Sequence, residues 1–151
     1  MRLCGDRTLG RLVKWLRILG IPCELVSYRH PDEIPAESLL LTRNRRLLSE
    51  KTLLVPYDRV EDQLRFVFEK LPELRRLEAP FRLCIRCNEP LEEVSREEVF
   101  GLVPDFVYET KERFRRCPSC GRVYWRGTHP SRMLSKLKQL GLLRAGIEVD
   151  G

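Results

Sequence analysis

Four of the six cysteines fall into two pairs of identical spacing, and this feature constrains the fold most strongly. The pairs are Cys84–Ile85–Arg86–Cys87 and Cys117–Pro118–Ser119–Cys120, separated by 29 residues. A two-residue gap lets one tight turn direct both thiolates at a single ion, and two such turns close a tetrahedral site with Zn–S distances of about 2.3 Å. A redox-active pair would need only one of the two motifs. The sequence therefore predicts a structural zinc ion held by Cys84, Cys87, Cys117 and Cys120.

The residues after each pair support this interpretation. Asn88 and Gly121 follow the second cysteine of each pair, and both residue types tolerate the left-handed backbone that such a turn requires. Because closure uses all four thiolates, no position remains for a catalytic water, and the predicted zinc supports the architecture rather than a reaction. Cys4 and Cys23 lack this spacing, and we interpret them as small buried side chains.

Composition excludes several classes of protein. The chain has 151 residues, which is the length of one domain or slightly more, with 42% hydrophobic and 33% charged residues. This composition excludes a disordered chain, and the lack of an apolar run of about 20 residues excludes an integral membrane protein. The first six residues contain no apolar signal core, so a cytoplasmic protein is expected. In that compartment, cysteines favour metal binding over disulfides.

Charge is distributed in blocks around a net value of +6. Residues 83–110 contain two arginines and seven acidic residues, whereas residues 111–144 contain ten lysines and arginines and a single glutamate. These blocks predict a basic surface near the C-terminus beside an acidic segment, and they favour an anionic partner. Two solvated faces of opposite charge are the alternative.

Hydrophobic periodicity predicts an α/β fold with a parallel sheet. Strand-like segments at 2–5, 23–28, 38–42 and 52–55 alternate with helical ones. The first predicted helix covers 9–19 and stops at Gly20, a short helix covers 45–51, and a longer one begins after Asp58 as its cap. A final helix at about 130–140 is predicted to direct four residues inward: Met133, Leu134, Leu137 and Leu140.

We divide the chain into four parts on this basis. Residues 1–80 form the α/β core, 81–128 the zinc ribbon, 129–143 a helix that packs back on the core, and 144–151 a tail. The boundary near residue 80 is marked by Glu78–Ala79–Pro80.

Polar residues follow each predicted strand of the core. Asp6 follows the first strand, Asp32 lies in the loop after the second, Asn44 follows the third, and Asp58 and Asp62 follow the fourth. Ligands collect at the carboxyl ends of parallel strands, and oxygen ligands suit Mg²⁺ or Mn²⁺. Such ions activate water for phosphodiester hydrolysis. Helix capping and ordinary surface positions are the alternatives for each residue taken alone.

Several longer motifs resemble one family. Residues 6–20 match D-x-x-L-G-x-L-x-x-W-L-R-x-L-G, residues 40–45 resemble L-L-T-R-D-R, and Gln63–Leu64 resembles a Q-L helix start. Residues 103–110 (VPDFVYET) and 117–129 (CPSCGRVYWRGTH) resemble the tail of the same family. This is the Mut-seven C-terminal RNase family, in which a PIN-like nuclease core is joined to a zinc ribbon.

The resemblance implies a PIN-like α/β fold and a ribonuclease that depends on Mg²⁺ or Mn²⁺. It implies Asp6 as the first metal ligand, Asp32 as the second and Asp62 near the position of a later acid. This chain departs from the family at Asn44, where the family has aspartate after Thr-Arg. An amide oxygen still ligates a metal, but it carries no charge and binds a hard cation more weakly.

Basic residues supply the expected contacts to RNA, which is the predicted partner. These are Arg43, Arg45 and Arg46 beside the predicted site, and Arg115, Arg122 and Arg126 interleaved with aromatic residues in the ribbon. Tyr124 and Trp125 either stack on bases or pack inside the protein. Three functions remain open at this point: an active ribonuclease, a degenerate RNA-binding protein, and a zinc-ribbon module that binds a protein. The oligomeric state and any protein partner stay undetermined.

Overall fold

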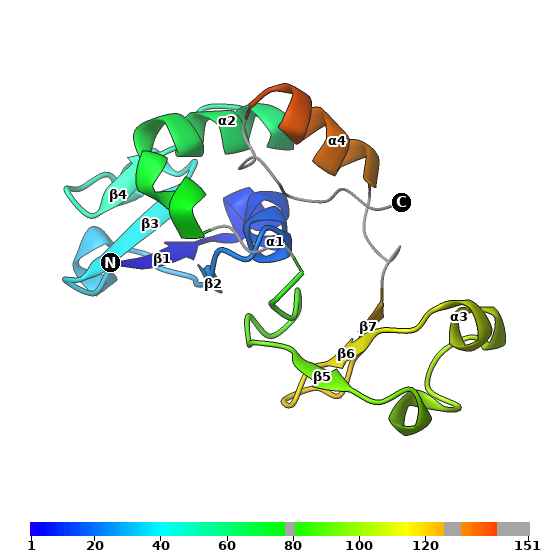
Figure 1. The fold of residues 1–151 in the computed structure, drawn as a ribbon. Coiled ribbons are helices and arrows are strands. Elements are labelled where there is room, and N and C mark those ends of the chain that lie inside the picture. The colour runs from blue at the N-terminus through cyan, green and yellow to red at the C-terminus, as the bar shows by residue number, and fades with distance from the viewer. Residues whose placement is uncertain (78–80, 126–130, 142–151) are drawn as a thin grey trace.

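The computed structural model describes residues 1–77, 81–125 and 131–141 and contains two sheets (Figure 1). The parallel sheet consists of β1 (Arg2–Gly5), β2 (Glu24–Leu25), β3 (Ser38–Thr42) and β4 (Thr52–Leu54) in the order β2-β1-β3-β4. All three strand pairs are parallel. The α/β class with a parallel sheet is confirmed, and β3 has the predicted bounds.

The second strand is shorter than predicted. Of the expected segment 23–28, only Glu24 and Leu25 pair with Cys4 and Gly5 of β1. One further hydrogen bond joins Val26 N to Gly5 O at 2.8 Å. Because β1 ends at Gly5, the chain beyond Val26 has no neighbouring strand with which to pair.

The two faces of the parallel sheet are covered differently. Helices α1 (Gly10–Ile18) and α2 (Val60–Lys70) pack in one apolar cluster with Leu3 and Leu41. The alternate residues Cys4 and Leu40 point to the opposite face, where they contact Ile34 and Leu47. Those two residues belong to short 3-10 turns and their flanks, at Pro31–Glu33 and Arg45–Leu47. The second face therefore lacks a full helix among the residues described.

Two predicted helix boundaries were wrong. The expected helix at 45–51 is only the turn Arg45–Leu47, because the nine residues between β3 and β4 are too few for a helical crossover. The capping position of α2 is Arg59 rather than Asp58, whose carboxylate instead lies 2.5 Å from the guanidinium of Arg43. Gly20 ends the first helix as predicted, with φ of 84°.

Helix α4 (Ser131–Gln139) lies beside α2 (Figure 1). Leu137 is fully buried in the main core, and Lys136 Nζ lies 3.9 Å from a carboxylate oxygen of Glu61 on α2. Leu140 was predicted to point inward, but it lies one residue beyond the end of α4 and is 40% exposed. The side chains of Met133 and Leu134 lie outside the described part of the protein.

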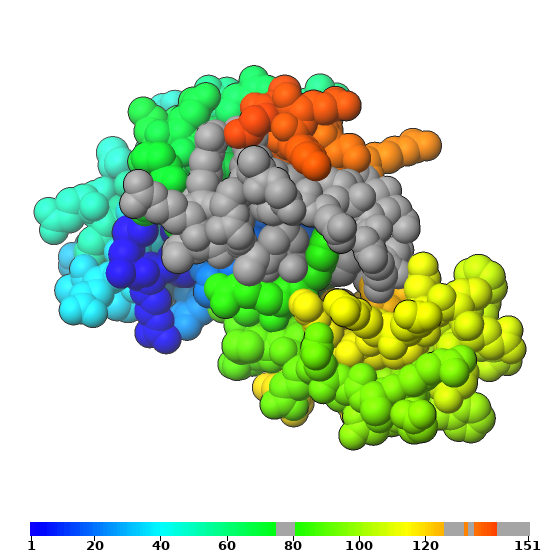
Figure 2. All heavy atoms as spheres, in the orientation of Figure 1, coloured from blue at the N-terminus to red at the C-terminus, as the bar shows by residue number. Residues whose placement is uncertain are grey.

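The antiparallel sheet consists of β5 (Glu92–Val94), β6 (Phe114–Arg116) and β7 (Val123–Trp125) in chain order. Helix α3 (Asp105–Thr110) lies in the segment between β5 and β6. A small core beneath it contains Val99, Val103 and Phe114. Residues 81–125 project from the parallel-sheet part (Figure 2). The predicted boundary at 78–80 lies outside the described residues.

Hydrogen bonds fasten the first cysteine pair to the end of α1. Arg17 Nη1 donates to the Ile85 carbonyl at 2.9 Å, and its Nε donates to the Cys23 carbonyl at 2.9 Å. Cys23 N donates to Asn88 Oδ1 at 3.0 Å, so the first turn of the cluster is joined to the parallel-sheet part by side chains from both. None of the described helices is long and apolar enough to cross a membrane.

Candidate functional site

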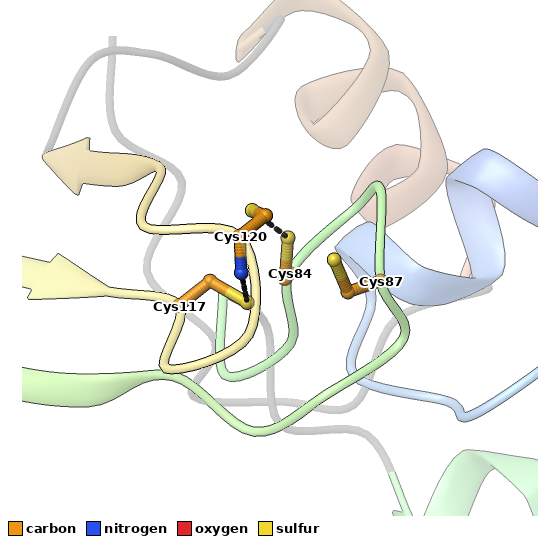
Figure 3. A group of neighbouring side chains, drawn as sticks. All are labelled: Cys84, Cys87, Cys117 and Cys120. Carbon is orange, nitrogen blue, oxygen red and sulfur yellow. Dashed lines mark hydrogen bonds between the residues drawn. The ribbon is translucent and has the colours of Figure 1, made fainter.

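The four predicted zinc ligands meet at one point. Cys84, Cys87, Cys117 and Cys120 turn their side chains toward one another (Figure 3), and their sulfur atoms all lie within 4.8 Å of each other. The Sγ atoms of Cys84 and Cys120 are 3.8 Å apart. Tetrahedral coordination with Zn–S bonds of about 2.3 Å places sulfurs roughly 3.8 Å apart. The donor set and its spacing are therefore consistent with a zinc site.

Both cysteine turns are built by the same backbone contacts. In the first turn, Asn88 N donates to the Cys84 carbonyl at 2.9 Å and Cys84 N donates to the Glu89 carbonyl at 2.8 Å. In the second, Gly121 N donates to the Cys117 carbonyl and Cys117 N to the Arg122 carbonyl, each at 2.9 Å. Asn88 and Gly121 have φ of 60° and 78°, so the predicted left-handed positions are confirmed.

The thiols of the cluster differ in acidity. Burial acts to raise the pKa of Cys84, but hydrogen bonds from the Tyr124 hydroxyl and from the backbone at Cys87 and Arg86 lower it to about 7. Desolvation and hydrogen bonds with Cys120 and Cys117 raise the pKa of Cys87 to about 12. Four sulfurs this close become thiolates together only when a cation balances their charge.

Tyr124 supports the cluster from outside. Its hydroxyl oxygen lies 3.2 Å from Cys84 Sγ and accepts a hydrogen bond from Ile85 N at 3.1 Å. Burial and the neighbouring Cys84 raise the pKa of the Tyr124 hydroxyl, so it keeps its proton and donates it to the sulfur. No motif in the sequence indicated this contact, because its two partners are 40 residues apart.

Replacing Tyr124 with phenylalanine tests this contact. The ring still fills its buried position, but Cys84 Sγ loses a donor and Ile85 N loses its acceptor. We expect zinc affinity to fall about tenfold, as for other partners that orient metal ligands. Competition with a chromophoric chelator measures the affinity, and Tyr108→Phe, on α3 of the same part of the protein, is the matched control. An affinity within twofold of the wild type would show that the hydroxyl does not support the cluster.

A second site lies at the carboxyl edge of the parallel sheet. Asp6 follows β1, and this residue is only 7% exposed. Its carboxylate accepts hydrogen bonds from Thr8 N at 3.0 Å and from the hydroxyls of Thr8 and Thr42. Thr42 is the last residue of β3, so the carboxylate is held between the ends of two neighbouring strands.

The same two threonines join the loops that follow β1 and β3. Thr42 Oγ1 accepts a hydrogen bond from Asn44 N at 3.0 Å, and Thr8 Oγ1 accepts one from Arg43 N at 2.9 Å. The chain leaves β1 toward β2 on one side, whereas β3 lies on the other side of β1. Ligands bind at such a reversal of strand order. The two threonines were missed in the sequence, although Thr42 is a polar residue directly after three leucines.

The predicted acids do not form a group of three or more around Asp6 among the described residues. Asn44 Oδ1 accepts from Arg46 N at 3.0 Å and so caps the turn Arg45–Leu47. The Asp32 side chain is 92% exposed and lies 3.3 Å from His30 Nδ1. Asp62 lies in the first turn of α2. Within residues 1–77, 81–125 and 131–141, three or more His, Cys, Asp or Glu side chains come close enough to hold an ion only at the four cysteines.

The predicted RNA-binding arginines have different surroundings. Arg45 and Arg46 are exposed beside the Asp6 edge, whereas Arg43 is paired with Asp58. In the ribbon, Arg115 Nη1 donates to the Phe81 carbonyl at 2.8 Å, and the Arg122 guanidinium lies 5.9 Å from the centre of the Tyr124 ring. Arg126 lies outside the described residues.

The two aromatic residues of β7 pack inside the ribbon. Tyr124 is 7% exposed in a cluster with Cys84 and Cys117. Trp125 is half-buried against the cluster that contains Phe114. Of the two interpretations of these rings, packing is therefore the one that the structure supports for Tyr124.

Comparison with known proteins identifies the family. The chain has no match among curated proteins and none among solved structures. The family model described as the Mut7-C RNAse domain matches residues 1–137, a range that includes both sheets, Asp6 and the four cysteines. The chain therefore belongs to the Mut7-C RNase domain family.

Proposed function

We propose that this protein is a ribonuclease that depends on Mg²⁺ or Mn²⁺ and hydrolyses phosphodiester bonds in RNA. The observation that carries the proposal is the buried carboxylate of Asp6, held by Thr8 and Thr42 where the order of the parallel strands reverses. Membership of the family supplies the reaction class. Zinc is the ion that we propose for the four cysteines, with a structural role.

The residues at this edge fit a hard cation. Mg²⁺ is commonly held by one or two carboxylates and completes its shell with water and substrate phosphate, so a full acidic cluster is not required. Asp6 provides the buried carboxylate, and Asn44 provides an amide oxygen on the adjoining loop. Asp32 and Asp62 remain the proposed second and third acids. A cation bound here would activate water and stabilise the leaving oxygen.

The chain's own groups fix the geometry around this position. Thr8 and Thr42 set the orientation of the Asp6 carboxylate, since each threonine also accepts a hydrogen bond from the backbone of the β3 loop. Gln63 Nε2 donates to the Tyr57 carbonyl at 2.8 Å and so fixes the loop after β4. Arg45 and Arg46 place positive charge beside this edge, where they would contact phosphates flanking the scissile bond.

Replacing Arg45 and Arg46 together with alanine should weaken RNA binding uniformly across sequences. Each phosphate contact contributes about 0.7 to the slope of log affinity against log salt for single strands, so we expect the slope to fall by about 1.4. Titration of labelled single-stranded RNA between low and moderate salt measures this slope. Arg2→Ala, on the opposite end of β1, is the control. An unchanged slope in the double variant would remove these two arginines from the RNA surface.

Binding of RNA without cleavage is the second candidate. It is favoured by Asn44, which lowers the negative charge at the Asp6 edge, and by the finding that, among the described residues, Asp6 belongs to no group of three or more acidic, His or Cys side chains close enough to hold an ion. Restoring the acid with Asn44→Asp separates the two candidates. An aspartate at this position also caps the following turn, so the substitution should leave the fold intact.

The deciding assay uses end-labelled single-stranded RNA with the purified protein and Mn²⁺, Mg²⁺ or EDTA. Cleavage that requires the added cation supports the proposed ribonuclease. Cleavage by Asn44→Asp alone, with salt-dependent RNA binding by the wild type, supports the second candidate. Failure of both proteins to cleave under any metal would contradict the ribonuclease.

A further inference from the structure

The segment between β5 and β6 exposes three large apolar side chains. Phe100 is 73% exposed, Leu102 is 54% exposed and Phe106 is 72% exposed. They lie in the turn before α3 and in its first turn, at the end of the ribbon farthest from the parallel sheet (Figures 1 and 2). Several large apolar side chains exposed within one short segment are typical of contact sites for another molecule.

These side chains are not needed to fill the core of the ribbon. The same segment already buries Val99 completely and Val103 to 9% exposure, and both pack with Phe114 of β6. Val107 and Tyr108 pack partly against the same cluster. The apolar residues of this segment are therefore of two kinds, one directed into the ribbon and the other directed into solvent.

The segment is held in one conformation by contacts of its own. The Arg96 guanidinium donates to the Tyr108 carbonyl through Nε at 2.9 Å and Nη2 at 2.7 Å, and it lies 4.3 Å from the centre of the Tyr108 ring. The rings of Phe100 and Tyr108 meet edge to face with centres 5.3 Å apart. A surface fixed in advance loses little conformational entropy on binding.

Acidic side chains flank the exposed apolar residues along this segment. Glu97, Glu98, Asp105 and Glu109 are all exposed in this segment, and residues 83–110 contain seven acids against two arginines. Arg96, one of these two arginines, is already bound to the Tyr108 carbonyl. Such a surface repels RNA phosphates and attracts a positively charged partner. A symmetric contact with a second copy of this chain would place the two acidic rims against each other.

We propose that Phe100, Leu102 and Phe106, with their acidic rim, form a docking surface for a protein whose contact surface surrounds apolar side chains with lysine and arginine. We call this the acidic apolar surface. It lies apart from the Asp6 edge, and its function does not depend on whether RNA is cleaved there. The partner's apolar side chains pack on the three exposed residues, and its basic side chains face the acidic rim.

A fluorescent helical peptide of about 18 residues, with leucine on one face and lysine on the other, is the probe. We expect the full-length, zinc-loaded protein to bind it, and the double variant Phe100→Ser, Phe106→Ser to bind it at least tenfold more weakly. A peptide with glutamate in place of lysine should not bind. Leu25→Ser, at a leucine on β2 that is as exposed as Leu102, is the matched control and should bind normally.

Three results would overturn the proposal. The first is that the leucine–lysine peptide does not bind the wild type, or binds the wild type and the double variant with the same affinity. The second is loss of RNA binding by the double variant, which would assign this surface to RNA. The third is self-association of the wild type in sedimentation that the double variant abolishes, which would make a second copy the occupant. If the double variant releases zinc, Leu102→Ser takes its place with the same expected direction.

Discussion

Replacing Asp6 with asparagine is expected to reduce metal-dependent RNA cleavage at least about 100-fold. Asparagine keeps the oxygen that accepts from Thr8 N, so the turn after β1 remains capped. It removes the negative charge that attracts a hard cation, and loss of a ligand should exceed the 10- to 100-fold effect of losing an outer partner. Initial cleavage rates over a range of Mn²⁺ concentrations measure the effect.

Two controls make the result interpretable. Glu50→Gln removes an exposed acid just before β4, at the opposite edge of the parallel sheet, and should cleave like the wild type. Thermal unfolding of Asp6→Asn should show that the variant is folded, and its RNA binding at low salt should be at least as tight as that of the wild type. If Asp6→Asn cleaves at the wild-type rate, then Asp6 does not hold the catalytic cation.

Replacing Cys117 with serine, or removing the metal with a strong chelator, is expected to unfold the antiparallel sheet. Structural zinc contributes about 10–16 kcal/mol of binding free energy in small domains, and this free energy is coupled to folding. The ribbon's own core is small, consisting mainly of Val99, Val103 and Phe114. Without the ion, this core is too small to hold residues 81–125 in place.

Metal analysis and limited proteolysis measure this effect. We expect about one zinc per chain in the wild type and none in Cys117→Ser, with new cleavage sites confined to the ribbon. The parallel sheet should stay folded, because α1 and α2 bury its larger core independently. Cys23→Ala is the matched control: it should keep the zinc and lose only about 1 kcal/mol of stability. A metal-free protein of unchanged stability would contradict the structural role.

The accuracy of the predictions from sequence depended on the range of the interactions. The strand Ser38–Thr42 was predicted with its observed bounds, because a run of leucines buried on both faces of a sheet needs only its own composition to be identified. The strand predicted at 23–28 was longer than the observed one, and the helix predicted at 45–51 did not form. The length of the second strand depends on where β1 ends, and the space for a helix after β3 depends on where β4 begins. Both limits are set by other segments of the chain.

The candidate sites show the same division. The sequence identified Asp6 at the end of the first strand, but the hydroxyl donors Thr8 and Thr42 became apparent only when β3 was placed beside β1. The resemblance implied Asp32 as the second metal ligand, and the structure places that side chain on the turn Pro31–Glu33, where it is 92% exposed.

The sequence by itself determined the four-cysteine cluster, because two-residue gaps and a left-handed residue after each pair are local requirements of the cysteine turn. Alternating apolar segments likewise determined the α/β class. Only the tertiary structure decided the strand order, the contact between Tyr124 and Cys84, and which apolar residues of 99–106 face solvent. These features depend on which distant segments cover each face, and burial of apolar surface is non-directional, so local sequence does not specify its partner.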